Sequence, residues 1–287
     1  MAKSIMIQGT ASGVGKSIIT TGLCRIFTQD GHRTAPFKSQ NMSSNAHMLA
    51  DGREMARSQA VQAYACGIEP DTDMNPILLK PVDGSVEVIL NGRREELKNR
   101  YEYNELKKNI WPRILEPYNR LCASNDVVVI EGAGSPVELN LNKDDIVNMG
   151  VAEKTNSLVI LVSDIHRGGV FASVYGTLSL FTENERKYVK GIIINKCIGE
   201  MDSFKDVKQK MEEIAGLPVV GMVPYFRLEI EDEDNLIDPN TCAKTSKSDM
   251  SEAEYRKYLD AQFDMLASML RDHLDIDRIY AIMEEGI

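Results

Sequence analysis

The chain has 287 residues, and 43% of them are hydrophobic, so it can form one large α/β domain with a sizeable core and is unlike a disordered protein. Its formal net charge of −10 argues against general affinity for nucleic acid. No apolar stretch approaches the roughly 20 residues of a membrane span, and the N-terminus runs straight into an expected strand instead of a signal peptide. We therefore expect a cytoplasmic protein with no membrane and no nucleic-acid partner.

The cysteines predict neither disulfides nor a zinc site. They are odd in number, scattered, and never arranged as Cys-x-x-Cys, which is typical of a reduced, cytosolic chain. The five cysteines are Cys24, Cys66, Cys122, Cys197 and Cys242. Excess acidic residues gather in Glu229–Asp238, which we interpret as a solvated loop.

Apolar runs alternate with helical patterns along the chain, and several runs, such as VVVI and LVILV, are continuous. Strands buried on both faces of a parallel sheet have this character. The expected strands are Ser4–Gln8, Thr34–Lys38, Asp126–Glu131, Ser157–Ser163, Val189–Asn195 and Pro218–Met222. The expected helices are Lys16–Gln29, Gly52–Cys66, Leu106–Ala123, Val170–Leu180 and Phe204–Ala215. The alternation predicts a doubly wound α/β fold with a mostly parallel sheet.

Two local patterns complete the expected elements. Asn91-Gly92 follows the apolar run Val86–Leu90 and predicts a turn in a small hairpin. Residues 239–250 are polar and loop-like, and Ser251 with Glu254 then forms a capping-box pattern at the start of a helix. Apolar residues on one face of this helix should pack on the rest of the protein; they are Phe263, Leu266, Met269 and Leu270. We expect a domain over 1–238, a linker with C-terminal helices over 239–287, and, by default, a possible homodimer.

The stretch GTASGVGKS, residues 9–17, has the order of a phosphate-binding loop: a strand, a glycine-rich turn, and a helix that opens at Lys16 and Ser17. Backbone N–H groups and the helix N-terminus would face a triphosphate. Lys16 can bridge the β- and γ-phosphates, and the Ser17 hydroxyl can bind Mg²⁺. Gly9 is followed by five residues before Gly15-Lys16, one more than in the usual signature. The longer spacing indicates a subclass of P-loop nucleotide-binding proteins.

A second magnesium ligand is expected at the end of another strand. Glu131 ends the run VVVIE and is followed by Gly-Ala-Gly, which would place its carboxylate in the crevice where α/β proteins bind ligands. Asp51 and Glu54 are further candidates.

Nine stretches in this order resemble the cobyric acid synthase family of cobalamin biosynthesis, across residues 4–235. They are GTASGVGKS (9–17), PFKSQNMSSNA (36–46), DGREMARSQAVQA (51–63), MNPILLKP (74–81), EGAGSPVELNL (131–141), DIVNM (145–149), SDIHRGGVFASVYGT (163–177), GIIINK (191–196) and GMVPYF (221–226). Relatives with the longer phosphate loop include dethiobiotin synthetase and cobyrinic acid a,c-diamide synthase. The resemblance implies a P-loop fold of the dethiobiotin synthetase type.

The resemblance also implies a reaction, in which ATP with Mg²⁺ phosphorylates the b, d, e and g carboxylates of adenosylcobyrinic acid a,c-diamide. Ammonia then displaces each acyl phosphate and gives adenosylcobyric acid. A carboxylate resists amines because oxide is a poor leaving group, and phosphorylation supplies a better one. Magnesium and lysines would neutralise charge while an anionic carboxylate attacks an anionic phosphate.

Residue roles follow from the positions that match the family. The resemblance implies ATP binding by Thr10, Gly13, Gly15, Lys16, Ser17, Asn195, Lys196 and Pro224. It implies magnesium binding by Ser17, Glu131 and, by comparison with dethiobiotin synthetase, Glu54. The implied catalytic residues are Lys16, Lys38, Glu131 and Asp164. The implied substrate-side residues are Gln40, Asn41, Asn75, Lys80, Ser135, Asn140 and Arg167.

The chain departs from the family pattern in three places. Full-length members carry a glutaminase domain with a Cys nucleophile, and no cysteine here lies in a Gly-x-Cys-x-Gly context. Because the tail over 261–286 resembles the family's extreme C-terminus, we expect a natural split enzyme that takes ammonia, free or from a separate glutaminase. His166 stands where the family usually has Asp, and we expect it to be buried. The family's NKFRGD is NKCIGE here, with Ile198 and Glu200.

Two alternatives stay open. One is an ATP-dependent carboxylate ligase that acts on another polyacid. The other is a nucleotide-switched scaffold like the partitioning ATPases, whose loop carries an early signature lysine that is absent from residues 8–11 here. Those ATPases often end in a membrane-binding helix, whereas the tail of this chain is rich in Asp.

Overall fold

The computed structural model describes residues 2–82, 85–95, 109–139, 145–226 and 251–287. Its centre is a six-stranded sheet in the order β12-β11-β10-β1-β9-β2, in which every neighbouring pair is parallel. The strands are β1 (Lys3–Gly9), β2 (Thr34–Phe37), β9 (Val127–Glu131), β10 (Leu158–Asp164), β11 (Val189–Cys197) and β12 (Val219–Pro224). Because β9 and β10 lie on opposite sides of β1, the chain reverses its winding there, which is where α/β sheets bind ligands.

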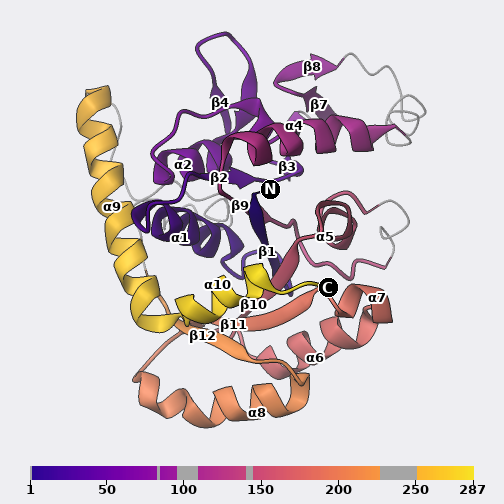
Figure 1. Cartoon of the computed structure of the whole chain (residues 1–287), viewed down its shortest axis with the longest axis vertical. Helices are drawn as coiled ribbons and strands as arrows, with labels where there is room; N and C mark the ends of the chain where they lie inside the picture. The colour runs from indigo at the N-terminus through magenta and orange to yellow at the C-terminus, as the bar shows by residue number, and fades with distance from the viewer. Residues whose placement is uncertain (1, 83–84, 96–108, 140–144, 227–250) are drawn as a thin grey trace.

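Side chains alternate between the two faces of the sheet and form two cores. On β1, Ile5 and Ile7 belong to one core and Met6 to the other, and all three are fully buried. The first face is covered by α1 (Lys16–Gln29), α9 (Glu252–His273) and α10 (Ile276–Glu284). The opposite face is covered by α4 (Ile110–Ser124), α5 (Met149–Thr155), α6 (Val170–Leu180) and α8 (Lys205–Ala215). Figure 1 shows α1 and α9 side by side, away from α5 and α6.

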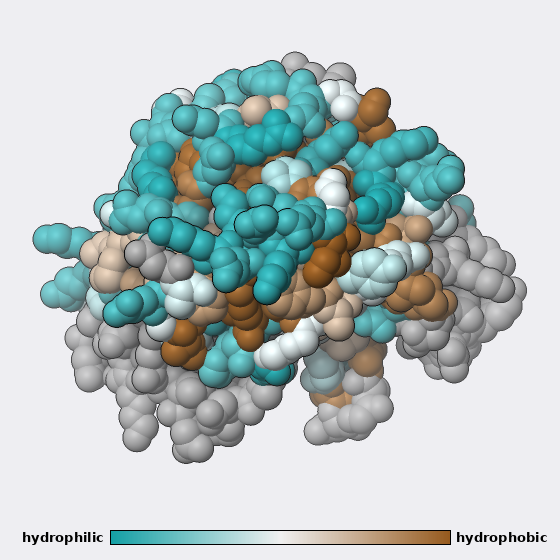
Figure 2. Space-filling model, turned by 90° about the horizontal axis from the view of Figure 1, so that it is seen from below, coloured by the Kyte–Doolittle hydropathy of each residue, from teal (hydrophilic) through white to brown (hydrophobic). Residues whose placement is uncertain are grey.

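Helix α8 shows how an amphipathic helix covers the sheet. Met211 and Ala215 are its buried residues, and most of its other residues are polar and charged. Figure 2, which views the molecule from the α8 side of Figure 1, shows hydrophilic residues over most of this face, with hydrophobic residues scattered between them. Among the described residues, no helix combines the length and the apolar character needed to cross a membrane.

A smaller sheet follows directly from the end of β2. Its order is β3-β6-β7-β8, with β3 parallel to β6 and the other pairs antiparallel. These strands are β3 (Gln40–Met42), β6 (Ile77–Val82), β7 (Ser85–Leu90) and β8 (Arg93–Glu95), and a separate pair consists of β4 (Ala46–Met48) and β5 (Glu54–Ala56). Helix α2 (Arg57–Ala65) follows β5 and places side chains in both cores. Short helical turns are η1 (Thr72–Met74), α7 (Glu183–Arg186) and η3 (Met201–Phe204).

Most expected elements are confirmed, including all six strands of the main sheet, the hairpin turn at Asn91-Gly92, and α1 and α6 at the expected boundaries. The expected helix over 52–66 is wrong at its start, because residues 54–56 pair with β4 and the helix begins only at Arg57. The capping box at Ser251 is present, and Phe263, Leu266 and Leu270 are buried. Residues 106–108, the acidic run 229–238, the linker 239–250 and Cys242 lie outside the described residues.

Candidate nucleotide site

The phosphate loop connects β1 to α1 and requires glycine at two positions. Gly13 and Gly15 have φ angles of +72° and +97°, a region that residues with a Cβ atom rarely adopt. A Cβ atom on Gly15 would also lie 2.1 Å from Nδ2 of Asn195. Gly15 therefore brings the start of α1 close to the end of β11, and the helix N-terminus faces the same loop.

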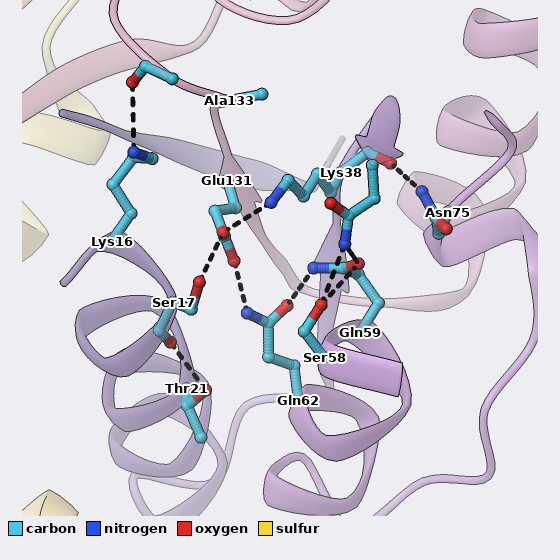
Figure 3. Close-up of polar contacts among 12 residues, drawn as sticks. Lys16, Ser17, Thr21, Lys38, Ser58, Gln59, Gln62, Asn75, Glu131 and Ala133 are labelled. Carbon is cyan, nitrogen blue, oxygen red and sulfur yellow. Dashed lines mark hydrogen bonds and ion pairs between the residues drawn. The ribbon is translucent and has the colours of Figure 1, made fainter. Parts of the chain in front are cut away.

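Lys16 joins the phosphate loop to the loop after β9. Its buried ammonium group donates to the backbone oxygens of Ala11, at 3.0 Å, and Gly134, at 3.1 Å. Figure 3 shows this side chain above the start of α1, with Ser17 turned toward Glu131. The lysine thus lies between the two loops that border the carboxyl ends of β1 and β9.

Glu131 lies at the centre of a buried cluster and is 1% exposed. Its Oε1 accepts hydrogen bonds from the Ser17 hydroxyl, at 2.8 Å, and from Lys38 Nζ, at 2.9 Å. Its Oε2 accepts one from Gln62 Nε2 at 2.6 Å. Burial raises the pKa of this carboxyl group, but the Lys38 ammonium and the hydrogen bonds from Gln62 and Ser17 outweigh burial and hold its pKa below the ordinary value. Glu131 is therefore a carboxylate.

Hard oxygen donors of this kind fit magnesium. A serine hydroxyl and a carboxylate oxygen lie 2.8 Å apart beside a helix N-terminus, and Mg²⁺ in nucleotide sites uses few protein ligands together with phosphates and water. Glu54 is on β5, where its carboxylate forms an ion pair with Lys80 at 2.7 Å. The structure therefore brings Ser17 and Glu131 together and pairs the other predicted ligand, Glu54, with a predicted substrate-side lysine.

The ends of β10 and β11 border the other side of the phosphate loop. Asn195 donates from Nδ2 to the backbone oxygen of Val14 at 2.9 Å, and Lys196 donates to the backbone oxygen of Gly13. Lys196 also lies 3.3 Å from Asp164, whose other carboxylate oxygen accepts the backbone N–H of His166 at 2.7 Å. The Thr10 and Ser163 hydroxyls lie 2.9 Å apart. Of these residues, Thr10, Gly13, Asn195 and Lys196 had been predicted to bind ATP and Asp164 to be catalytic, whereas Val14 and Ser163 had been given no role.

The loop after β9 is held by a residue that the sequence analysis quoted without a role. Asn148, in the stretch DIVNM, donates from Nδ2 to the backbone oxygens of Ala133, at 2.7 Å, and Ser135, at 3.2 Å. Its Oδ1 accepts the N–H of Ala133 at 3.2 Å. Asp145 in turn accepts the backbone N–H of Asn148 at 2.9 Å. An Asp three residues before an Asn at the start of a helix was the available signal, because both types commonly bind nearby backbone groups.

The predicted substrate-side residues do not share one position. Asn75 is 1% exposed, and its amide binds the backbone of Lys38, Ala56 and Ile77, which argues against direct contact with a substrate. Asn41 is also buried and donates to Ser58 and Gln59. The others are half-buried or exposed: Gln40 at the start of β3, Lys80 within β6, Ser135 after β9 and Arg167 after β10. Asn140 lies outside the described residues.

The expectation that His166 is buried is wrong. His166 follows the end of β10, is exposed, and lies with its ring centroid 6.1 Å from that of Tyr225. Tyr225 directly follows Pro224 and donates its N–H to the backbone oxygen of Cys197 at 2.8 Å. Gly168 and Gly169 follow in the same loop with φ angles of +78° and +73°, and residues 166–169 are all exposed.

These features define a nucleotide-binding α/β domain of the P-loop class, with the phosphate loop after the first strand and an acidic residue at the end of a neighbouring strand. The chain belongs to the family described as the CobQ/CobB/MinD/ParA nucleotide binding domain, whose profile matches residues 5–236.

Curated relatives named cobyric acid synthase are similar over the same region. That of Ruminiclostridium cellulolyticum is 54% identical over 237 residues, which are 82% of this chain and 46% of the relative. That of Clostridium kluyveri is 54% identical over 238 residues, covering 83% of this chain and 48% of the relative. That of Citrobacter koseri is 49% identical over 252 residues, covering 87% of this chain and 50% of the relative. The chain thus spans about half the length of the curated relatives it matches.

Proposed function

We propose that this chain is the ATP-using part of an amide ligase, and that it binds ATP and Mg²⁺ at the phosphate loop. The observation that carries the proposal is the contact of Glu131 with both Ser17 and Lys38, at 2.8 and 2.9 Å. Ser17 and Glu131 would hold Mg²⁺, which would neutralise charge on the β- and γ-phosphates. Lys16 would exchange its two backbone acceptors for phosphate oxygens. Asn195, Lys196 and Pro224 would border the base.

The proposed reaction has two steps. A carboxylate oxygen of the acceptor attacks the γ-phosphorus of ATP, and the bond to ADP breaks, which leaves an acyl phosphate. Ammonia then attacks the acyl carbon, the bond to phosphate breaks, and an amide forms with loss of a proton. Lys38 lies between β2 and β3 and is 2.9 Å from Glu131, so it can balance the negative charge that gathers when the acceptor approaches ATP. Asp164 would keep Lys196 directed toward the phosphate loop.

The relatives' name suggests the acceptor, which we propose to be a corrinoid polycarboxylate. In the form implied by the sequence resemblance, the b, d, e and g carboxylates of adenosylcobyrinic acid a,c-diamide are amidated to adenosylcobyric acid. We also propose that nitrogen reaches this chain as ammonia, either free or from a separate glutaminase.

Mass spectrometry of the product tests both the proposed acceptor and the proposed nitrogen source. The pure protein is incubated with Mg-ATP and adenosylcobyrinic acid a,c-diamide, with ammonium in one tube and glutamine in another. We expect stepwise replacement of OH by NH₂ with ammonium only, and loss of product in Glu131→Gln. Glu213→Gln is the matched control, because this glutamate is exposed on α8 and accepts a hydrogen bond from Gln209 of the same helix. Product from glutamine alone would contradict the nitrogen source.

Other results would favour the alternatives. ATP turnover with no dependence on a carboxylate would contradict the ligase and favour a nucleotide switch. Turnover stimulated by a different polyacid would contradict the corrinoid acceptor and leave the ligase chemistry in place.

A further inference from the structure

Three buried amides form a directed chain that ends on Glu131. Asn41 Nδ2 donates to Gln59 Oε1 at 2.9 Å, Gln59 Nε2 donates to Gln62 Oε1 at 3.4 Å, and Gln62 Nε2 donates to Glu131 Oε2 at 2.6 Å. Figure 3 shows Gln59 and Gln62 side by side on α2, with Gln62 pointing at the carboxylate. The chain thus runs from β3, through one face of α2, to the end of β9.

The spacing along α2 places these groups on one face. Gln59 and Gln62 are three residues apart, and Ser58 precedes Gln62 by four, so all three side chains project in similar directions. The Ser58 hydroxyl donates to Gln59 Oε1 at 3.1 Å and accepts from Asn41 Nδ2 at 3.0 Å, which fixes the orientation of both amides. Gln59 and Gln62 are fully buried, and Asn41 is 3% exposed.

Burying three amides lowers the stability of the fold unless each amide forms hydrogen bonds. Buried amides lose their hydration, and apolar side chains of similar size fill a core at lower cost. We infer that this hydrogen-bonded row of amides contributes more than packing. It makes the two oxygens of Glu131 different: Oε2 takes the Gln62 amide, while Oε1 faces Ser17 and Lys38. Rotation of the carboxylate would break the bond to Gln62.

We propose that Gln62 is a positioning residue for the magnesium site, and that Gln59 and Asn41 hold Gln62 in place from β3. Gln62 fixes the carboxylate plane so that Oε1 is presented beside the Ser17 hydroxyl. Strand β3 begins two residues after Lys38. The hydrogen-bonded amides therefore link the orientation of Glu131 to the strand that follows this lysine. The inference rests on the proposed function, in which Ser17 and Glu131 bind Mg²⁺.

The test measures how nucleotide binding depends on magnesium. A fluorescent ATP analogue is titrated onto the full chain at increasing Mg²⁺, and also in EDTA. In Gln62→Met we expect the Mg²⁺ concentration for half-maximal enhancement to rise about 10- to 100-fold, as for other partners of metal ligands. Binding in EDTA should change less than twofold, because the phosphate loop is intact. Gln59→Met should give a smaller rise of the same kind.

Gln8→Met is the matched control. Gln8 is equally buried, on β1, and within the described residues its Oε1 has no hydrogen-bond partner while its Nε2 faces the sulfur of Met6. The substitution removes a buried amide of the same kind, whereas the side chains that donate to Glu131 within the described residues are Ser17, Lys38 and Gln62, so we expect the magnesium midpoint to stay within twofold. Circular dichroism establishes that each variant is folded at the temperature used.

The outcomes separate the two proposals. A folded Gln62→Met with the wild-type magnesium midpoint overturns this inference and leaves the proposed function standing. If Gln62→Met does not fold, Gln59→Met decides the question in the same way. A wild-type protein whose nucleotide binding ignores Mg²⁺ overturns both. An equal rise in Gln8→Met would mean that removing any buried amide raises the Mg²⁺ concentration needed for half-maximal enhancement. That result would also overturn the inference.

Discussion

The Lys38–Glu131 pair is the most consequential contact at the level of single residues, because both partners are buried and each satisfies the other. Removing one partner of such a pair leaves a buried, uncompensated charge and typically costs about 3–5 kcal/mol. We therefore expect Lys38→Met to lower the free energy of unfolding by about that amount, measured by urea denaturation at neutral pH.

The double variant Lys38→Met with Glu131→Gln tests this explanation. Gln removes the unpaired charge but keeps an oxygen for Ser17, so the double variant should be more stable than Lys38→Met alone. A double variant as unstable as the sum of the two single changes would show that packing, and not charge, explains the loss.

The phosphate loop offers a second comparison between neighbouring residues. Gly13 and Gly15 share a left-handed backbone, but a Cβ atom on Gly13 would meet nothing within 4 Å, whereas one on Gly15 would lie 2.1 Å from Asn195. Gly13→Ala should lose about 1–2 kcal/mol of stability from backbone strain alone. Gly15→Ala should lose more and should displace Asn195. Thermal unfolding of the two variants measures the difference, and equal losses would contradict a role for the Asn195 contact.

Helix α9 is held against α1 by a close approach at Gly22. A Cβ atom there would lie 2.1 Å from Cδ1 of Leu270 and 3.2 Å from Cγ of Leu266. Alanine is a better helix former than glycine by roughly 1 kcal/mol, so a stabilising effect would be expected from helix propensity alone. We expect Gly22→Ala to be destabilising nevertheless, because the buried side chains of Leu266 and Leu270 must shift to make room for the added methyl group.

Gly176 in α6 is the matched control for this prediction. It is also a helical glycine, but a Cβ atom there would meet nothing within 4 Å. Gly176→Ala should therefore be neutral or stabilising by roughly 0.5–1 kcal/mol in denaturant melts. If both variants gain stability, the α1–α9 contact is looser than the structure indicates.

The success of sequence reasoning differed between elements for physical reasons. Buried parallel strands such as Val127–Glu131 are continuous apolar runs, so the sequence predicts them well. The start of α1 could also be predicted, because the phosphate loop ends there. Residues 54–56 become a strand only through pairing with β4, a contact that no local pattern reveals. C-terminal helices were expected over 239–287, but the start of α10 was not located, although Asp275 caps its first turn.

The same limit applies to the site. The contact between Ser17 and Glu131 could be anticipated, because the phosphate loop and the end of a buried strand both have distinctive sequence patterns. Gln62 and Asn148 act through neighbours that are 69 and 15 residues away in sequence, so only the fold reveals their partners. Exposure of His166 also depends on the direction of its loop, which sequence spacing does not give.

At the scale of the whole molecule, α9 and α10 belong to the same core as the phosphate-loop domain. Phe263, Leu266 and Leu270 are fully buried in the cluster that contains Ile5 and Ile7 of β1. Arg25 of α1 also forms an ion pair with Asp264 of α9 at 2.7 Å. The C-terminal helices therefore cover one face of the main sheet and complete its core.

A single substitution in α9 can test whether the molecule unfolds as one unit. Leu266→Ala should cost about 2–5 kcal/mol, because it leaves a cavity against α1. The neighbouring Met265 is 49% exposed, so Met265→Ala should change stability by less than about 0.5 kcal/mol. Trp111, the single tryptophan, packs against the core on the opposite side of the sheet and reports on that side. In Leu266→Ala, tryptophan fluorescence and far-ultraviolet circular dichroism should shift to the same lower midpoint. If the fluorescence midpoint stayed at the wild-type value, α9 would unfold separately, and the C-terminal helices would be an appended layer and not part of one cooperative core.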